Sequence, residues 1–167
     1  FKNKISYRKF NLYCQQAYTW LDENLTSSDF EDEDQRSDYR QQELARCDEN
    51  ALYFLNKYVY YQDGDAEDKS GTEKYIARPT HEFLAYMDDC GYSIAMAKGR
   101  QQAVTTTIMS LSTRDVIFKT NHFMKFITED DKKAVEIFED KLKFPFGMLP
   151  DWMRPNILNE RDNLFKV

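Results

Sequence analysis

Two stretches near the start of the chain repeat apolar residues at the spacing of an amphipathic helix. The first predicts a helix over about residues 4–25, with Ala17 and Leu21 on its apolar side. The second predicts a helix over about residues 37–60, whose apolar face is wide, as a packing helix needs. We therefore expect an N-terminal helical subdomain over residues 1–62.

Two polar segments interrupt this pattern. Residues 27–35 are dominated by acidic side chains that repel one another, which predicts an exposed loop. Residues 62–73 combine glycines with many charges, which is typical of a surface loop. This second loop is the predicted boundary between the helical subdomain and the rest of the chain.

From residue 74 onward, short apolar runs alternate with helical patterns. Tyr92–Ala97 and His122–Thr128 are expected as short strands, with a helix over 105–118 between them. Further helices are expected over 81–89 and after Thr128, which can act as an N-cap. The C-terminal tail predicts a hairpin.

Strand, helix and strand in this order form a βαβ unit, which builds a parallel sheet with a right-handed crossover. The expected fold class is therefore α/β: a P-loop NTPase-type parallel sheet with flanking helices over residues 74–167, preceded by the helical segment and incomplete as a domain. Ligands of such sheets bind at the carboxyl ends of the strands. The polar loop Lys98–Val104 lies at that end.

Composition narrows the class of protein. The chain has 167 residues, of which 41% are hydrophobic and 15% aromatic, and this argues against disorder. No apolar run approaches the roughly 18 residues of a membrane span. The net charge of -6 argues against a chain whose main task is to coat DNA. The start at Phe1, without Met or an apolar leader, predicts a fragment.

Metal and disulfide motifs are not supported by the residue spacing. The three cysteines lie far apart, which favours neither a zinc site nor a disulfide framework and fits a reducing cytoplasm. His81-Glu82 begins like the H-E-x-x-H zinc helix, but Ala85 stands where the second histidine is required.

The segment Tyr92–Thr107 (YSIAMAKGRQQAVTTT) has the strand–loop–helix order of a phosphate-binding loop. In such loops, backbone N–H groups and the helix N-terminus hold phosphate oxygens, and a hydroxyl at the helix start ligates Mg²⁺. The match to G-x-x-x-x-G-K-[ST] is poor, because Val104 takes the Lys position and Ala103 the second Gly. Spacing alone leaves open a polar loop before an ordinary helix.

The loop resembles the deviant phosphate-binding loop of bacteriophage large terminases, which is close to K-A-R-Q-Q-G-F-T-T. This chain has KGRQQAVTT over Lys98–Thr106. Arg78–His81 is similar to the family's adenine-reading Y-P-x-Q element, with His81 in place of Gln. Phe123–Phe138 resembles the strand and helix that follow, and Met148–Pro155 (MLPDWMRP) resembles the family's L-P-x-W-x-x-P. The resemblance covers about residues 50–167.

This resemblance implies the N-terminal part of the ATPase domain of a DNA-packaging motor, with ATP and Mg²⁺ as cofactors. It implies that Arg100, assisted by Lys98, is the catalytic partner of the phosphate charge, and that Thr105 ligates Mg²⁺. The nucleotide contacts that it implies are Gly99, Gln101, Gln102, Ala103, Val104, Thr105, Thr106, Arg78 and His81.

The same resemblance implies partners for the complete protein. These are double-stranded DNA, the portal protein, the small terminase subunit and further copies in a ring. It would act in the host cytoplasm, transiently on the procapsid portal, and would also cut DNA with a nuclease domain.

No apolar strand in this chain ends in the Asp-Glu pair of a Walker B motif, so we expect the fragment to be inactive alone. Two other interpretations stay open. One is a non-enzymatic module that docks the portal or small terminase and carries a vestigial loop. The other is a helicase-type P-loop protein, which MLPDWMRP disfavours.

Overall fold

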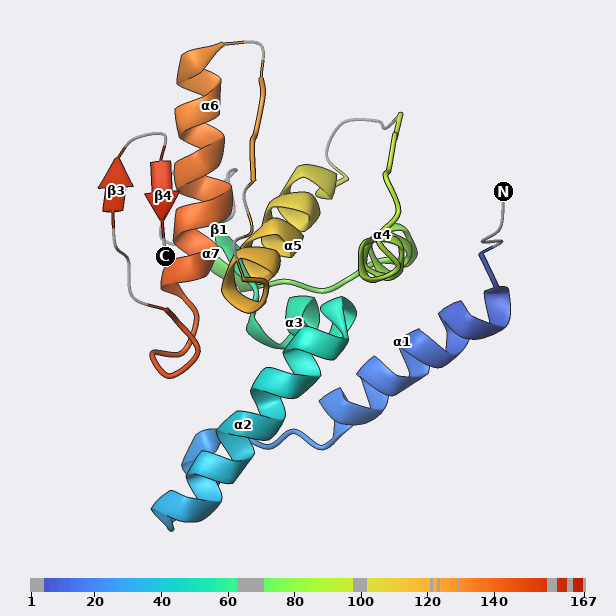
Figure 1. Cartoon of the computed structure of the whole chain (residues 1–167), viewed down its shortest axis with the longest axis vertical. Helices are drawn as coiled ribbons and strands as arrows, with labels where there is room; N and C mark the ends of the chain where they lie inside the picture. The colour runs from blue at the N-terminus through green and yellow to red at the C-terminus, as the bar shows by residue number, and fades with distance from the viewer. Residues whose placement is uncertain are drawn as a thin grey trace.

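The computed structural model describes residues 5–62, 71–97, 102–120, 122, 124–128 and 130–155, and the backbone of 159–161 and 164–166. Helices dominate these residues (Figure 1). The helical elements are α1 (Tyr7–Asp22), the 3₁₀ turn η1 (Ser27–Asp29), α2 (Glu33–Glu49), α3 (Ala51–Tyr58), α4 (Pro79–Asp89), α5 (Val104–Phe118), α6 (Asp131–Phe138), the π-helical turn η2 (Glu139–Lys143) and α7 (Phe144–Gly147).

The strands form two small antiparallel ribbons. Strand β1 (Tyr60–Gln62) pairs with β2 (Thr72–Lys74), with Tyr61 opposite Glu73. Strand β3 (Asn159–Arg161) pairs with β4 (Leu164–Lys166), which confirms the predicted C-terminal hairpin.

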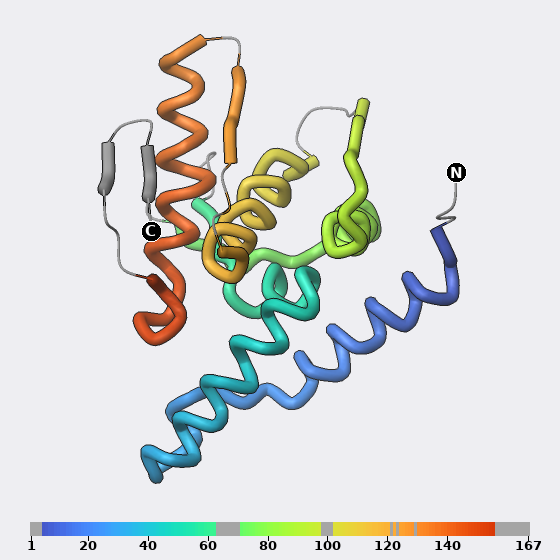
Figure 2. The backbone as a smooth tube through the Cα atoms, viewed as in Figure 1, coloured from blue at the N-terminus to red at the C-terminus, as the bar shows by residue number. Residues whose placement is uncertain are grey.

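The predicted P-loop NTPase-type parallel sheet is wrong. The segments 92–97 and 124–128 are extended but join no ladder among the residues described. Both rise in Figures 1 and 2 on either side of α5, which descends between them, so they do not meet. Most of 92–97 is also exposed, whereas a parallel strand is normally covered on both faces. The helix predicted between them, over 105–118, is present as α5, but the two flanking segments are not strands of a sheet.

Several helices begin at residues that are typical of a helix start. Ser6 caps α1, and its hydroxyl accepts a hydrogen bond from Lys9 N. Pro79 stands at the first position of α4, where its missing N–H costs nothing. For α6 the cap is Asp130, not the predicted Thr128, and Asp130 Oδ1 lies 2.7 Å from Lys133 N.

The predicted helix over 37–60 is interrupted at Asn50. This residue adopts an extended backbone (φ -138°, ψ 105°), and its side-chain Oδ1 accepts from Tyr53 N at 3.1 Å. Asparagine favours such a cap over a helix interior because its side chain replaces a backbone partner. The chain therefore turns between α2 and α3.

Helix α3 lies at the centre of the hydrophobic core, with α1, α2, α4 and α5 around it. Nearly all of its side chains are buried. The core continues into the C-terminal part through the half-buried Trp152, whose ring packs edge-on against Tyr58. One continuous core thus draws on both predicted parts of the chain and carries α4 and α5, the two helices that hold the candidate site.

Candidate phosphate-binding site

The candidate loop enters α5 through a left-handed residue. Ala103 has φ 51° and ψ 13°, a conformation that glycine adopts without cost and alanine only with strain. This is the position at which the terminase loop carries glycine. Lys98, Gly99, Arg100 and Gln101 lie outside the described residues; Gln102 and the positions after it lie within them.

The threonines at the start of α5 have different environments. Thr105 is half-buried and faces a groove, whereas Val104 and Thr106 have buried side chains. Thr107 is fully buried, and its hydroxyl donates to Ala103 O at 3.0 Å. Thr105 is therefore the threonine of this turn that lines the groove.

His81 connects helix α4 to the loop. Its ring is 2% exposed and lies beside the Tyr75 ring, with centroids 5.5 Å apart. Ring Nδ1 accepts a hydrogen bond from Arg78 N at 3.2 Å, and ring Nε2 lies 2.8 Å from Gln102 O. The structure thus brings the predicted element Arg78–His81 against the predicted loop. The Arg78 side chain is exposed.

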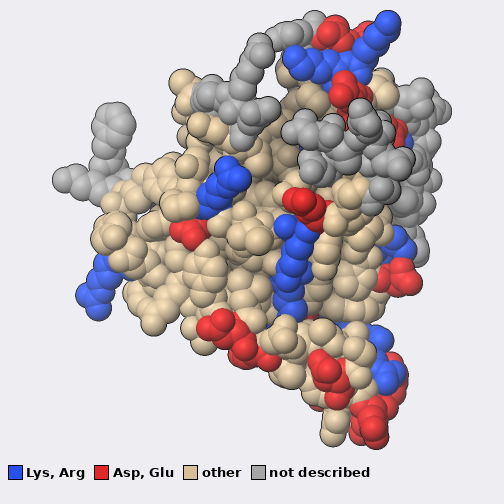
Figure 3. Space-filling view, turned by 180° about the vertical axis from the view of Figure 1, so that it is seen from behind, with Lys and Arg blue, Asp and Glu red and all other residues tan. Residues whose placement is uncertain are grey.

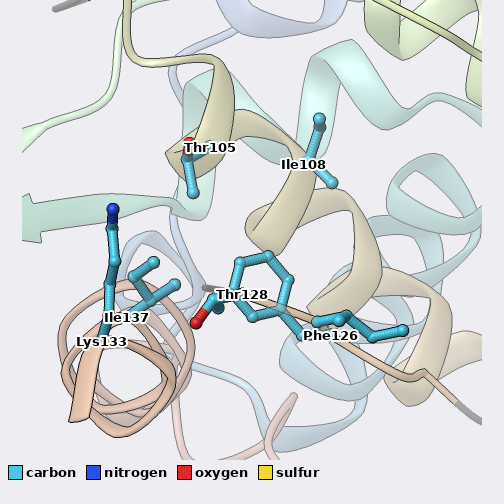
Figure 4. Close-up of a pocket in the computed structure, with 7 residues that line it drawn as sticks. Thr105, Ile108, Phe126, Thr128, Lys133 and Ile137 are labelled. Carbon is cyan, nitrogen blue, oxygen red and sulfur yellow. The ribbon is translucent and has the colours of Figure 1, made fainter. Parts of the chain in front are cut away.

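A groove opens beside the first turn of α5 (Figure 4). Its volume is about 470 Å³, and its walls come from α5, the extended segment 124–128 and α6. The lining residues are Thr105, Ile108, Phe126, Ile127, Thr128, Lys133 and Ile137. Figure 4 shows Thr105 of α5 and Lys133 of α6 on opposite sides of this groove.

This geometry suits an anion next to an apolar body. The first amides of a helix have no intrahelical acceptor and point toward its N-terminal end, which carries partial positive charge. The groove beside this turn is lined by Thr105 and Lys133 and by the apolar side chains of Ile108, Phe126 and Ile137. Within the described ranges, no group of three or more His, Cys, Asp or Glu side chains could hold a metal ion.

Sequence reasoning missed Lys133 and the groove wall formed by 126–128. These residues were predicted as parts of a strand and a helix, and no local pattern indicates that they face Thr105. Their role depends on how α6 packs near α5, which is a tertiary property.

A buried ion network fixes the orientation of α4 and α5. Arg114 of α5 is 3% exposed; its Nε donates to Cys47 O at 2.7 Å, and its guanidinium also donates to Asp48 O. It therefore caps the C-terminal end of α2. Arg114 Nη1 donates to Asp89 Oδ1 at 2.6 Å, so the same side chain holds the end of α4.

Neither the comparison with protein-family models nor that with curated proteins finds a match for this chain. In the part of the chain that the structure describes, no helix combines the length and apolar character that crossing a membrane requires.

Proposed function

We propose that this chain belongs to a packaging ATPase of the large terminase type and binds the phosphates of ATP at the start of α5. The observation that carries the proposal is the hydrogen bond between His81 Nε2 and Gln102 O, 2.8 Å long. It joins two segments that the terminase resemblance assigned independently to one nucleotide site. The left-handed Ala103 and the accessible Thr105 support the same assignment.

Each residue has a proposed role. Arg100, assisted by Lys98, neutralises charge on the β- and γ-phosphates, and backbone amides from Gly99 to Thr106 hold the phosphate oxygens. Thr105 would supply a hydroxyl ligand to Mg²⁺. The bound ion would draw negative charge away from the phosphates during transfer. Lys133 lies near enough to the groove to add a second cation from α6.

The proposed partners follow from the complete motor rather than from this chain alone. Double-stranded DNA, the portal protein, the small terminase and further copies in a ring remain proposals. Acidic side chains gather at the end of the molecule formed by η1 and the start of α2 (Figure 3). That end repels phosphate backbones, so we place any DNA path elsewhere.

Nuclear magnetic resonance can test the proposed site directly. We would titrate the chain with a non-hydrolysable ATP analogue and Mg²⁺ and follow its backbone amides. The proposal expects the largest shifts at residues 98–107 and in the first turn of α4. Absence of shifts there at millimolar analogue would contradict it.

A second candidate is a non-enzymatic docking module for the portal or small terminase. The observation in its favour is that α1 leaves large apolar side chains exposed, among them Tyr7 at 76% and Leu12 at 56%. Exposed apolar surface of this kind can serve as an interaction site. This candidate expects partner binding that Tyr7→Ser or Leu12→Ser weakens, together with no response of the loop amides to nucleotide.

A further inference from the structure

We infer that His81 is a positioning residue, which holds the turn at Gln102 and Ala103 that leads into α5 and does not read the nucleotide base. The inference rests on the proposed function, because it assigns a role to His81 within that same site. It departs from what the resemblance implies for this position, where the family has a base-reading Gln.

The hydrogen bonds define the protonation of the His81 ring. Arg78 N–H is a donor, so the Nδ1 that faces it at 3.2 Å must be the unprotonated nitrogen. The proton of the neutral ring then lies on Nε2, which donates to Gln102 O at 2.8 Å. Both polar atoms of the ring are therefore occupied by main-chain partners. A buried ring with no remaining donor or acceptor has no edge to offer a base.

The two carbonyls that flank the left-handed turn are held from different sides. His81 holds Gln102 O, the carbonyl that precedes Ala103. Ala103 O accepts from Thr107 N at 2.9 Å and from Thr107 Oγ1 at 3.0 Å. Since the Thr107 hydroxyl donates to Ala103 O, the Tyr75 hydroxyl, 2.6 Å away, must donate to Thr107.

Alanine does not adopt the left-handed region unaided, so surrounding contacts must impose it. Tyr75 packs beside the His81 ring and also bonds Thr107, so it links the two anchors. Loss of the His81 donor would release Gln102 O and allow the turn at Ala103 to relax. The amides at the start of α5 would then lose their common orientation.

Two substitutions separate the nitrogens of His81. In His81→Gln the terminal amide can replace the Nε2 donor to Gln102 O. In His81→Asn the shorter amide can replace the Nδ1 acceptor for Arg78 N–H but cannot reach Gln102 O. The pair therefore tests the anchor while both variants keep a polar side chain at the same buried position.

Two measurements are made on the wild type and on both variants. The first is hydrogen exchange of the Thr107 amide, which bonds Ala103 O and so reports on the turn. The second is the affinity for a fluorescent ATP analogue and a GTP analogue. We expect His81→Asn to speed Thr107 exchange and to weaken both nucleotides about tenfold, the scale of one lost hydrogen bond. His81→Gln should stay within about twofold of the wild type in both.

Other results separate the two claims. The anchoring role of His81 would be overturned if Thr107 exchange and nucleotide affinity were the same in His81→Asn and the wild type. It would also be overturned if both variants lost affinity equally. A change in ATP-over-GTP preference without a change in Thr107 exchange would also overturn it, because the ring would then read the base. If the wild type binds no nucleotide, the proposed function fails, and Thr107 exchange still decides whether His81 anchors the turn.

Discussion

Arg114 Nη1 and Asp89 Oδ1 lie 2.6 Å apart and join the middle of α5 to the last residue of α4. The other oxygen of Asp89 accepts from Ala51 N at 2.8 Å and from the Tyr13 hydroxyl at 2.6 Å. One carboxylate thus meets α1, the start of α3 and α5. The relative position of the two helices that carry His81 and the candidate loop depends on this buried contact.

Replacement of Arg114 by Met should therefore destabilise the fold strongly. The change leaves the partly buried Asp89 without its cation and uncaps the carbonyls at the end of α2. We expect a loss of about 3–5 kcal/mol in the free energy of unfolding, measured by urea denaturation. Arg8→Met on the exposed side of α1 is the matched control and should cost less than about 0.5 kcal/mol. Equal losses in the two variants would contradict this account of Arg114.

Glu43 predicts a pH dependence of stability. Its fully buried carboxylate accepts from the Tyr53 hydroxyl at 2.8 Å and from the Tyr58 hydroxyl, and it lies 2.8 Å from Lys57 Nζ. Burial acts to raise the pKa of Glu43, but the hydrogen bonds from Lys57, Tyr58 and Tyr53 outweigh it and lower the pKa below its ordinary 4.5. Its contribution is therefore complete above about pH 4.5 and is lost as the pH falls through the folded-state value.

The Glu43→Gln variant tests this direction of the pH dependence of stability. At pH 7 the variant should lose about 3 kcal/mol of unfolding free energy, since Lys57 keeps a buried charge without its partner. The deficit should shrink between pH 4.5 and pH 3, where the wild type also loses the ionised carboxylate. Glu33→Gln, exposed on the same helix, should show neither effect. If the loss of unfolding free energy in Glu43→Gln stayed constant between pH 4.5 and pH 3, the pH dependence would not come from the Glu43 carboxylate.

For Asp88 we expect stability to change with pH in the direction opposite to that for Glu43. Burial, together with the charge of Asp115, raises the pKa of Asp88, and among the described residues its Oδ2 has no hydrogen-bond donor. Ionised Asp88 therefore opposes folding at neutral pH, and the penalty disappears as the pH falls below its folded-state pKa. We expect Asp88→Asn to raise the free energy of unfolding by about 1 kcal/mol at pH 7 and by less at pH 4. Loss of stability at pH 7, measured by thermal denaturation, would refute this.

The helices were largely predictable from local signals. The apolar periodicity before Asp22, the helical pattern over 81–89 and the apolar run after Val104 each placed a helix within a few residues of its position. The break at Asn50 was not predicted, because the apolar face continues across it. Only the cap geometry of Asn50 shows that α2 and α3 are separate helices.

The strands could not be assigned from the sequence for a different reason. A short apolar run such as Tyr92–Ala97 predicts an extended backbone, but pairing depends on a neighbour that local sequence does not specify. The contact between His81 and Gln102 joins segments 21 residues apart, which no local pattern specifies. Lys133 and the groove wall follow from helix packing and have no local signal.

Ala103→Gly should relieve strain at the loop. Glycine adopts φ 51° freely, so we expect a gain of about 0.5–1 kcal/mol, reduced by the larger entropy of glycine in the unfolded chain. Ala134→Gly inside α6 is the control with the opposite sign and should cost about 1 kcal/mol. Differential scanning calorimetry measures both. A loss of stability in Ala103→Gly would argue against a left-handed backbone at this residue.

Equilibrium titration of a fluorescent ATP analogue in Mg²⁺ is the most direct test of phosphate binding at the start of α5. The account predicts saturable binding to the wild type, near-wild-type affinity in Thr105→Ser, about tenfold weaker binding in Thr105→Val, and loss of binding in Arg100→Ala. Valine keeps the shape of threonine but lacks the hydroxyl, whereas serine keeps the hydroxyl. The two variants together therefore isolate the contribution of the hydroxyl. Absence of saturable binding to the wild type, or equal affinities in all four proteins, would contradict the account.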